Sequence, residues 1–470
     1  MNNRKILFIL FCSLFVVCEA LFAQTPPALT KFLKKGNLSH AAISLKAVDL
    51  SNGQIFVSHN DNMALIPASN LKIVTTATAL DVLGANFRYE THLFYSGSIK
   101  DSVLTGNVYV KGAGDPTLGS EFMNSEKEAF LKEWLAGIKK AGIKRISGDI
   151  VALDQLFGYE GVSSKWLLED IGNYYASGVY GISVFDNMYR LYIRTTAPGN
   201  EIRILRTEPA LKDLEFTSEL TVSETPSDDI YIFGTPFSNQ RRLTGTAPAN
   251  KPAIVVKGDI PDPGLFLAQY FYTYLQNHGV KIAGKATTYR LEPKAAELEK
   301  ELFQYKSHSL EEIVREVNVK SNNHYADHLY KTLTVSKQID IPAYWKNKGL
   351  DSKALNMFDG SGLSPVDAVS SGFLVDILVY MDKKGGQTGA FYKSLPVAGR
   401  EGTVASFLKN TPLEGKARLK SGSITSVHSY SGYIEKNNKR YAVSLIVNNF
   451  SGKRTELKKA IELLFVELFN

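Results

Sequence analysis

The chain is 470 residues long, which exceeds the size that a single hydrophobic core usually serves, so two or three domains are expected. Hydrophobic residues make up 44% and charged residues 21% of the sequence, without low-complexity tracts, and this composition excludes a largely disordered protein. The net charge of +7 is mild and is not gathered in lysine- or arginine-rich blocks, so a nucleic-acid partner is not expected.

The N-terminal segment 1–23 has the pattern of a secretory signal peptide. Arg4 and Lys5 precede an apolar run over 6–17, and Ala20 and Ala23 are candidate cleavage positions. A membrane anchor is the alternative, but the run is shorter than the roughly 20 apolar residues that span a bilayer. We therefore expect export to the periplasm without stable membrane insertion.

Both cysteines, Cys12 and Cys18, lie inside this signal segment. Lipid attachment at Cys18 is a further alternative, although the preceding Val17 is bulkier than the small residue usual at such sites. After cleavage no thiol remains, which excludes disulfides, thiolate metal sites and cysteine catalysis.

The first predicted elements are two strands and a buried helix. Residues 41–49 and 54–57 have strand character, and the Ser51-Asn52-Gly53 sequence between them indicates a hairpin turn. A helix is predicted over 69–83, after a proline and before Gly84. Its interior is apolar on most sides, which is typical of a helix enclosed in a core.

The stretch 92–300 differs, because short strand-like runs separated by Gly, Pro, Asn and Asp dominate it. Helical patterns interrupt these runs only at about 124–141 and 263–278. We interpret this stretch as an inserted, mostly β region.

Helices return after residue 300. A capping box predicts a helix over 309–319, and a second helix is expected over 325–335. Strands are predicted at 429–435 and 440–447, joined by an Asn-Asn turn, and an amphipathic helix follows from about residue 455.

The first chemical motif is Ser69-x-x-Lys72. A serine hydroxyl needs a base, and a lysine three residues later on a helix shares its face. Ser406 and Lys409 repeat the spacing, but a proline-containing stop follows them, so we expect a structural role for this second copy. Only Ser69 opens a buried helix.

Two further motifs accompany the first, Ser321-Asn322-Asn323 and Lys420-Ser421-Gly422-Ser423. Each is weak alone, because Ser-x-Asn is a common loop or capping sequence. The order Ser-x-x-Lys, Ser-x-Asn, Lys-Thr-Gly is that of penicillin-binding proteins and class A β-lactamases, with Ser421 in place of the threonine. The set predicts a serine acyl-transfer enzyme without a catalytic histidine.

The chain resembles the D-alanyl-D-alanine carboxypeptidase/endopeptidase family, the low-molecular-mass class C penicillin-binding proteins. This family inserts domains between its first two motifs, as the distance from residue 69 to residue 321 allows, whereas β-lactamases do not. The stretches that carry the resemblance are Pro67–Lys72, Gly114–Leu118, Ser321–Asn323, Asp359–Ser364, Leu395–Gly399 and Lys420–Ser423.

The resemblance implies an α+β fold. A penicillin-recognising domain, an antiparallel sheet flanked by helices, would comprise 24–91 and 301–470. A mostly β second domain would comprise 92–117 and 175–300, with a third domain, 118–174, nested in it.

The resemblance also implies roles for the motif residues. Ser69 would attack the carbonyl of the penultimate D-alanine of a peptidoglycan stem peptide, or the ring of a β-lactam, with Lys72 as base. Ser321 would relay the proton to the leaving amine, Asn323 would hold the substrate amide, and Lys420 would supply positive potential.

Substrate binding is expected at the remaining motif residues and at one inserted segment. Ser421 and Ser423 would bind the terminal carboxylate, beside Gly422, and the backbone N–H groups of Ser69 and Ser423 would form the oxyanion hole. The resemblance suggests that Asp170 and Tyr175 contact the peptide side chain, although a surface or core role is equally open. Pro365 stands where some members carry an arginine that can pair with a substrate carboxylate.

No metal or other cofactor is predicted. His324 and His328 have a spacing that suits a metal, but Tyr325 replaces the glutamate of a His-Glu-x-x-His motif. Two alternative functions stay open, a serine β-lactamase, which needs rapid deacylation, and a cell-wall binding protein without turnover.

Overall fold

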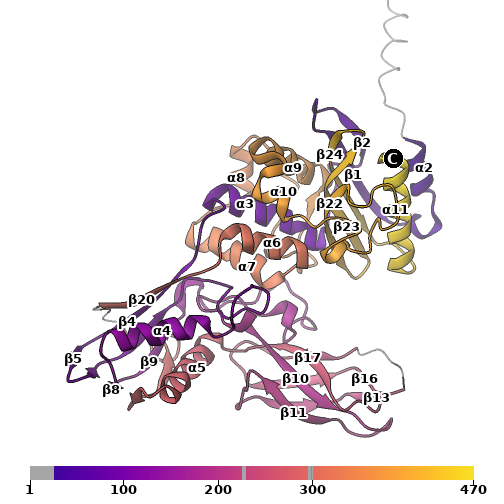
Figure 1. Ribbon diagram of the computed structural model, residues 1–470. Coiled ribbons are helices and arrows are strands. Elements are labelled where there is room, and N and C mark those ends of the chain that lie inside the picture. The colour runs from indigo at the N-terminus through magenta and orange to yellow at the C-terminus, as the bar shows by residue number, and fades with distance from the viewer. Residues whose placement is uncertain (1–25, 225–228, 295–297, 299, 470) are drawn as a thin grey trace, which may run out of the picture.

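The computed structural model describes residues 26–469 apart from 225–228, 295–297 and 299, so the predicted signal peptide lies outside the described residues. Figure 1 shows an upper body built from both ends of the chain and a lower body built from its middle. Within the described ranges, no helix is both long and apolar enough to cross a membrane.

The upper body is organised around one antiparallel sheet, with the strand order β2-β1-β24-β23-β22. The predicted first hairpin is confirmed, because β1 (Ala42–Asp49) pairs with β2 (Ile55–His59). The predicted C-terminal pair is confirmed as β23 (Val427–Lys436) and β24 (Lys439–Asn448). The edge strand β22 (Ala417–Ile424) carries the Lys420–Ser423 motif.

Helices cover both faces of this sheet, each over its own hydrophobic core (Figure 1). One face packs on α2 (Pro27–Leu33) and on α11 (Arg454–Phe469), the predicted amphipathic helix. On the other face α9 (Ser371–Gly385) packs directly on the sheet. The helices that share its core are α3 (Lys72–Leu83), α6 (Leu310–Lys320), α7 (Asn323–Lys331), α8 (Ile341–Asn347) and α10 (Ala390–Ser394). This arrangement confirms the predicted α+β class.

The predicted helix over 69–83 begins differently from the expectation. Residues Ala68–Leu71 form a 3₁₀ turn, η3, and the α-helix α3 starts only at Lys72. Ala68 has a φ of 48°, in the left-handed region that non-glycine residues rarely adopt. The tighter turn places Ser69 and Lys72 on one side of the helix start.

A sharp break separates α6 from α7. The predicted capping box at Ser309 begins α6, and Ser321 ends it in the left-handed conformation, with φ 61° and ψ 36°. The side chain of Asn322 accepts a hydrogen bond from Tyr325 N at 3.1 Å and so caps α7. Helix α7 begins at Asn323, two residues before the predicted start, and a π-helical segment, Thr332–Ser336, continues it to the predicted end near residue 335.

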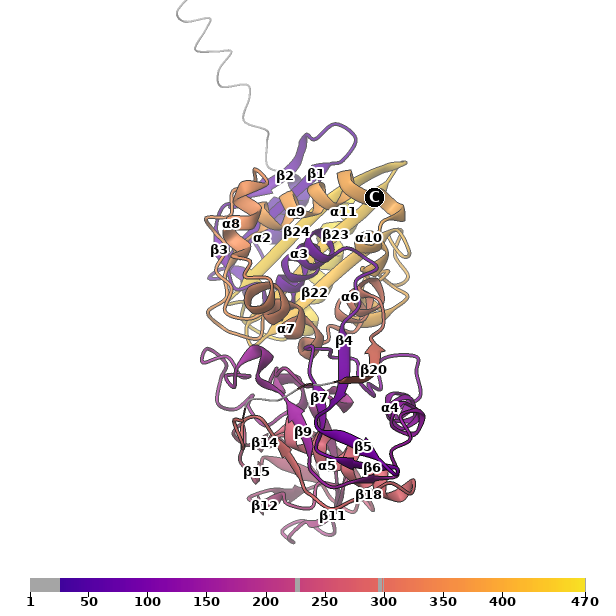
Figure 2. The same ribbon diagram turned by 90° about the vertical axis from the view of Figure 1, so that its left-hand side faces the viewer.

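The lower body contains the predicted short strands and both predicted helices, α4 (Ala129–Lys140) and α5 (Pro263–Asn277). Its largest sheet has the order β19-β9-β7-β4-β20, and smaller sheets follow (Figure 2). The strands are β4 (Glu90–Tyr95), β5 (Ser98–Lys100), β6 (Val103–Thr105), β7 (Val108–Lys111), β8 (Arg145–Ile146), β9 (Ile150–Leu153), β10 (Met188–Arg194), β11 (Arg203–Glu208), β12 (Glu215–Ser218), β13 (Thr221–Ser223), β14 (Tyr231–Phe233), β15 (Gln240–Thr244), β16 (Thr246–Pro248), β17 (Ile254–Asp259), β18 (Lys281–Ile282), β19 (Ala286–Thr288) and β20 (Lys300–Lys306).

The chain enters and leaves the lower body side by side. Strands β4 and β20 pair antiparallel, and just outside them Tyr89 N donates to Ser307 Oγ at 2.8 Å and Ser307 N donates to Tyr89 O at 3.0 Å. The predicted domain limits at 91/92 and 300/301 fall inside these two strands. One hydrophobic cluster joins side chains from 118–174 with side chains from the rest of the insertion, so the nested domain stays a prediction.

Candidate active site

The centre of the site is the amine of Lys72, in the first turn of α3. Its side chain is fully buried. Its Nζ lies 2.9 Å from Ser69 Oγ, 2.7 Å from Asn323 Oδ1 and 2.7 Å from the carbonyl oxygen of Ser361. The structure therefore brings the predicted Ser69–Lys72 pair together and adds Asn323 from the α6–α7 break.

Burial sets the charge of this amine. It lowers the pKa of Lys72 to about 8, and the nearby carboxyl groups of Asp327, Asp359 and Asp367 oppose the change. About a tenth of the amine is therefore neutral at pH 7 and about half at pH 8, and the neutral form is the one that can act as a general base.

The three contacts also orient the neutral amine. A neutral amine has two N–H groups and one lone pair. The carbonyl oxygens of Asn323 and Ser361 can only accept, so they occupy the two N–H groups of Lys72. The lone pair is then left to accept the hydroxyl proton of Ser69.

The second lysine, Lys420 on β22, is also fully buried. Its Nζ lies 2.9 Å from Ser321 Oγ and donates to the Ser421 carbonyl at 2.6 Å. Burial, with a smaller contribution from the charge of Lys72, places the pKa of Lys420 well below its usual value. The two amines therefore disfavour carrying full charge at the same time.

Strand β22 approaches the 3₁₀ turn closely at Gly422. A Cβ atom there would lie 2.5 Å from Pro67 O, 2.9 Å from Asn70 N and 2.4 Å from Ser429 Oγ, so only glycine fits. The buried Asn70 amide joins the two elements, with its nitrogen 2.8 Å from Lys420 O.

The other β22 side chains meet different partners. Ser421 Oγ donates to Thr403 Oγ1 at 2.8 Å. The Ser423 hydroxyl is buried and has no hydrogen-bond partner among the described residues. The sequence analysis missed Thr403, which contacts β22 from a short 3₁₀ helix, Gly402–Val404, that carries no recognisable motif.

Asp170 and Tyr175 lie beside the site, on the inserted segment. The Tyr175 hydroxyl donates to Asp170 Oδ1 at 3.1 Å. Burial raises the pKa of the Asp170 carboxyl, against the effect of this hydrogen bond. Asn323 connects this pair to Lys72, because its Nδ2 donates to the Tyr175 carbonyl at 2.9 Å and its Oδ1 accepts from Lys72 Nζ.

The glycine-rich turn after Asp359 contributes the Ser361 carbonyl that accepts from Lys72. Asp359 Oδ1 accepts from Ser361 N at 3.0 Å and Gly362 N at 2.6 Å, and Oδ2 accepts from Ser364 N at 2.8 Å. Gly362 has a φ of 75°, and a Cβ there would lie 2.0 Å from Ala68 O. The sequence analysis named this stretch only as part of the family resemblance and did not predict that Ser361 would supply an acceptor for the lysine.

The family model of the D-Ala-D-Ala carboxypeptidase 3 (S13) family matches residues 26–467. The chain belongs to this family.

Curated relatives of this S13 family member have the corresponding names. A D-alanyl-D-alanine carboxypeptidase of Actinomadura sp. (strain R39) is 26% identical over 449 residues, which cover 88% of this chain and 79% of that protein. A penicillin-sensitive carboxypeptidase A of Dictyostelium discoideum is 24% identical over 450 residues, covering 89% of this chain and 85% of that protein. The family prediction is therefore confirmed.

Solved structures share the fold. Penicillin-binding protein 4 of Haemophilus influenzae has a TM-score of 0.81 at 22% identity, covering 94% of this chain and 98% of that chain. A predatory peptidoglycan endopeptidase of Bdellovibrio bacteriovorus has a TM-score of 0.53 at 15% identity, covering 92% of this chain and 93% of that chain. The predicted penicillin-binding fold is thereby confirmed over nearly the whole chain.

Two buried carboxyl groups close to the lysine were missed by the sequence analysis. Asp327, on α7, accepts from Gly360 N at 2.7 Å, and Asp367 accepts from Phe358 N at 2.7 Å. Burial, followed by repulsion from Asp359, raises the pKa of Asp367 to about 10 and places that of Asp327 well above its usual value. Burial therefore favours the protonated form of both carboxyl groups.

The two histidines of α7 hold the inserted region. His324 is buried, with Nδ1 3.1 Å from Ser177 Oγ and Nε2 2.7 Å from Ser183 Oγ. His328 Nδ1 donates to the Gly114 carbonyl at 2.9 Å. Over the described part of the chain, no group of three or more His, Cys, Asp or Glu side chains is arranged to hold a metal ion.

The second Ser-x-x-Lys copy lies on the surface. Ser406 is exposed, and its hydroxyl accepts a hydrogen bond from Lys458 Nζ at 2.6 Å on α11.

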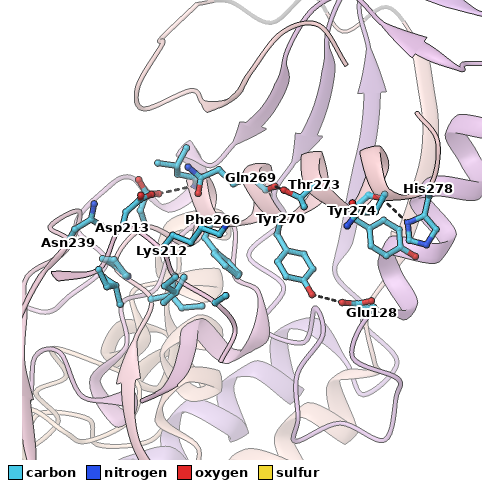
Figure 3. A pocket seen from close by; sticks show the side chains of 18 residues that line it. Glu128, Lys212, Asp213, Asn239, Phe266, Gln269, Tyr270, Thr273, Tyr274 and His278 are labelled. Atoms are coloured by element: carbon cyan, nitrogen blue, oxygen red, sulfur yellow. Dashed lines mark hydrogen bonds between the residues drawn. The ribbon is translucent and has the colours of Figure 1, made fainter. Parts of the chain in front are cut away.

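A pocket of about 620 Å³ lies apart from these residues, in the inserted region (Figure 3). Helix α5 lines one side of it, and Lys212 and Asp213 stand on the other. Tyr270 donates to Glu128 within it. It contains none of the residues predicted for the active site.

Proposed function

We propose that this protein is a serine-type D-alanyl-D-alanine carboxypeptidase and DD-endopeptidase that acts on peptidoglycan stem peptides and is acylated by β-lactams. The observation that carries the proposal is the buried amine of Lys72 beside Ser69, with both of its N–H groups occupied by carbonyl acceptors. Membership in the S13 family and the names of its relatives support the substrate class.

In the first step Ser69 Oγ attacks the carbonyl carbon of the penultimate D-alanine. The new O–C bond forms while neutral Lys72 takes the hydroxyl proton. The carbonyl oxygen becomes an oxyanion, which the backbone N–H groups of Ser69 and Ser423 would stabilise. Such donors contribute about 3–4 kcal/mol each to other transition states.

In the second step the C–N bond breaks and the nitrogen leaves as an amine. The proton that Lys72 took in the first step passes to the nitrogen through the hydroxyl of Ser321, which lies 2.9 Å from Lys420 Nζ. The leaving amine belongs to terminal D-alanine in the carboxypeptidase reaction and to a cross-linking side chain in the endopeptidase reaction. Water then hydrolyses the same acyl-enzyme in both cases.

The substrate carboxylate would complete the charge balance. Ser421 and the unpartnered hydroxyl of Ser423 are available to bind it next to Lys420. A carboxylate there favours the protonated form of Lys420, and repulsion between the amines then favours neutral Lys72. Substrate binding would thus prepare the base.

Export fits this substrate. The segment 1–23 has the pattern of a signal peptide, and peptidoglycan lies outside the cytoplasmic membrane, so we propose a periplasmic location.

The test is covalent labelling by a fluorescent penicillin, followed by intact-mass measurement and mapping of the modified peptide. The native protein should gain one adduct on the peptide that contains Ser69. Ser69→Ala should remove the adduct, whereas Ser406→Ala, in the second copy of the motif, should leave it unchanged. Persistent labelling of the Ser69→Ala variant would show that the nucleophile is elsewhere.

Turnover separates the proposal from its alternatives. The penicillin adduct should be long-lived, and purified muropeptides should lose terminal D-alanine. Rapid loss of the adduct would indicate a β-lactamase, and a folded protein that releases no D-alanine would indicate a binding protein.

A further inference from the structure

The two carbonyl acceptors of Lys72 are themselves held by the inserted segment 163–176. The first acceptor belongs to Asn323. Its amide nitrogen donates to the Tyr175 carbonyl at 2.9 Å, which leaves Oδ1 facing Lys72 Nζ at 2.7 Å. The backbone of the insertion thus fixes which end of the amide faces the lysine.

The second acceptor, the Ser361 carbonyl, is held through Asp359. Besides the backbone N–H groups of its turn, this carboxylate accepts the indole N–H of Trp166 at 2.7 Å. Asp359 is 3% exposed and Trp166 is 8% exposed. In the same segment, Ser163 Oγ donates to Phe358 O at 3.3 Å.

The indole bond matters because the carboxylate is buried. A buried carboxylate requires hydrogen bonds to offset its lost hydration, and a bond to a charged acceptor is stronger than a neutral one. Without the indole N–H, the Asp359 carboxylate loses one side-chain donor and keeps the backbone donors of its turn and its contact with the Asp367 carboxyl. A cavity of about 290 Å³ borders Trp166, Asp327 and Asp359, so water has space to enter there.

We propose that Trp166 is a positioning residue for the acyl transfer, and that the segment 163–176 directs the Lys72 lone pair at Ser69 by fixing both carbonyl acceptors. This inference rests on the proposed function. Trp166 does not touch the reacting atoms. It acts through Asp359 and the turn that presents the Ser361 carbonyl.

Trp166→Phe is the decisive variant, because it keeps an aromatic ring and removes the N–H. The chain offers a matched control in Trp345, whose indole N–H also donates to a buried acceptor, Thr78 Oγ1, at 2.8 Å. Trp345 lies in the upper body, as Lys72 does, and its described contacts are with Thr78, Tyr344 and Tyr380 rather than with Asn323 or Asp359. Trp345→Phe therefore tests for a general cost of losing a buried indole bond.

The measurement is the acylation rate by benzylpenicillin over a range of pH, resolved into reversible binding and the chemical step. Trp166→Phe should slow the chemical step about tenfold or more, equivalent to about 1.4 kcal/mol, with little change in binding. The acid limb of the pH–rate profile of Trp166→Phe should move to higher pH. Water that enters near the amine reduces its burial, and the pKa of Lys72 then rises toward its usual value. Trp345→Phe should change neither quantity.

The groups that face the amine during this titration are the same in both variants. They are Asp327 from α7, Asp359 and Asp367 from the turn region, and Lys420 from β22. A shift confined to the Trp166→Phe variant therefore reports the lost indole bond.

The inference is overturned if Trp166→Phe is acylated at the native rate and with the native pH profile. It is also overturned if both tryptophan variants slow acylation equally, or if the loss follows only the fraction of unfolded protein, measured by thermal denaturation. The proposed function fails separately, by labelling that persists in Ser69→Ala, so the two failures are distinguishable.

Discussion

Lys72 and Lys420 are both buried, but their surroundings assign them different tasks. Lys72 has two carbonyl acceptors and a serine hydroxyl around its amine, so its neutral form has a lone pair directed at Ser69. Lys420 faces the Ser321 hydroxyl and the Ser421 carbonyl of the edge strand, beside the place proposed for a substrate carboxylate. Burial lowers the pKa of both amines, so the two lysines differ in the hydrogen-bond partners around each amine and not in the direction of their pKa shifts.

The acylation rate should rise with pH through about 8. Burial lowers the pKa of Lys72 to about 8, the neutral amine is the reactive form, and its fraction increases above that pKa. Stopped-flow acylation by benzylpenicillin from pH 6 to pH 10 would measure the midpoint.

Lys72→Arg is the matching variant, because a guanidinium does not lose its proton in this range. The loss of a general base should reduce acylation by about 10²–10⁴-fold at every pH. A flat profile in the native protein, or normal acylation of the arginine variant, would contradict the assigned base.

At the residue scale, the three short motifs were sufficient to predict Ser69, Lys72, Asn323, Ser321 and Lys420, which the structure brings together. Ser69 and Lys72 share a local turn, and their spacing alone places them on one face. Thr403, Asp327 and the Ser361 carbonyl could not be predicted, because they reach the site through packing between distant segments. A backbone carbonyl has no signature in a sequence.

At the scale of elements, the site depends on the contact between the edge strand β22 and the 3₁₀ turn η3. Gly422 allows this contact, since every nearby atom around its missing Cβ is closer than ordinary van der Waals distance. Ser429 Oγ also donates to Pro67 O at 2.6 Å, which ties β23 to the same turn.

Gly422→Ala should separate the strand from the turn. The added methyl would overlap Pro67 O, so we expect a destabilisation of about 1–3 kcal/mol and acylation slowed by about tenfold or more. Urea unfolding and stopped-flow acylation would measure the two effects.

Gly36→Ala is the control for this substitution, because nothing lies within 4 Å of the Cβ position and the residue is exposed. It should leave both quantities unchanged. Native acylation in a folded Gly422→Ala protein would show that the close approach is not required.

The elements with strong apolar periodicity were predicted well from the sequence. The irregular 3₁₀ turn at the start of α3 was not predicted. The hairpin β1–β2 and the helix α11 follow alternating or helical apolar patterns that packing preserves. The 3₁₀ start of α3 was missed because Ala68 adopts a left-handed conformation that alanine does not prefer, and Gly362 packs against its carbonyl. Tertiary contacts determine that conformation.

At the scale of the whole molecule, helix α7 joins the two bodies. His324 and His328 face the inserted region from the helix that also carries Asn323. Burial, assisted by repulsion from His328, places the pKa of His324 well below its usual value, and burial lowers that of His328 to about 3. The spacing that suggested a metal therefore serves a buried interface of neutral imidazoles.

These histidines should make the protein less stable as pH falls. Histidine in the unfolded chain has a pKa of about 6.5, whereas burial lowers the pKa of His328 to about 3 in the folded protein. Between these two values the unfolded chain binds a proton at this position and the folded protein does not, which favours unfolding. His328 should thus lower the free energy of unfolding by about 2 kcal/mol between pH 7 and pH 5. Urea unfolding at both pH values would measure this loss.

His328→Asn should reduce the pH dependence by that amount, because the amide can still donate to the Gly114 carbonyl but does not titrate. His40→Asn, at an exposed position, should keep the native dependence. Equal slopes in the native protein and the His328→Asn variant would refute the neutral imidazole.

The paired entry and exit strands have a consequence for how such a chain can change. Because Tyr89 and Ser307 already hydrogen-bond to each other, a short loop grafted between them would bypass the entire excursion without stretching the remaining polypeptide. Modules of different size could be exchanged at this junction while the nucleophile stayed in place. Each replacement module would need its own equivalents of the Trp166 indole and the Tyr175 carbonyl, because these two groups of the insertion hold the acceptors of Lys72.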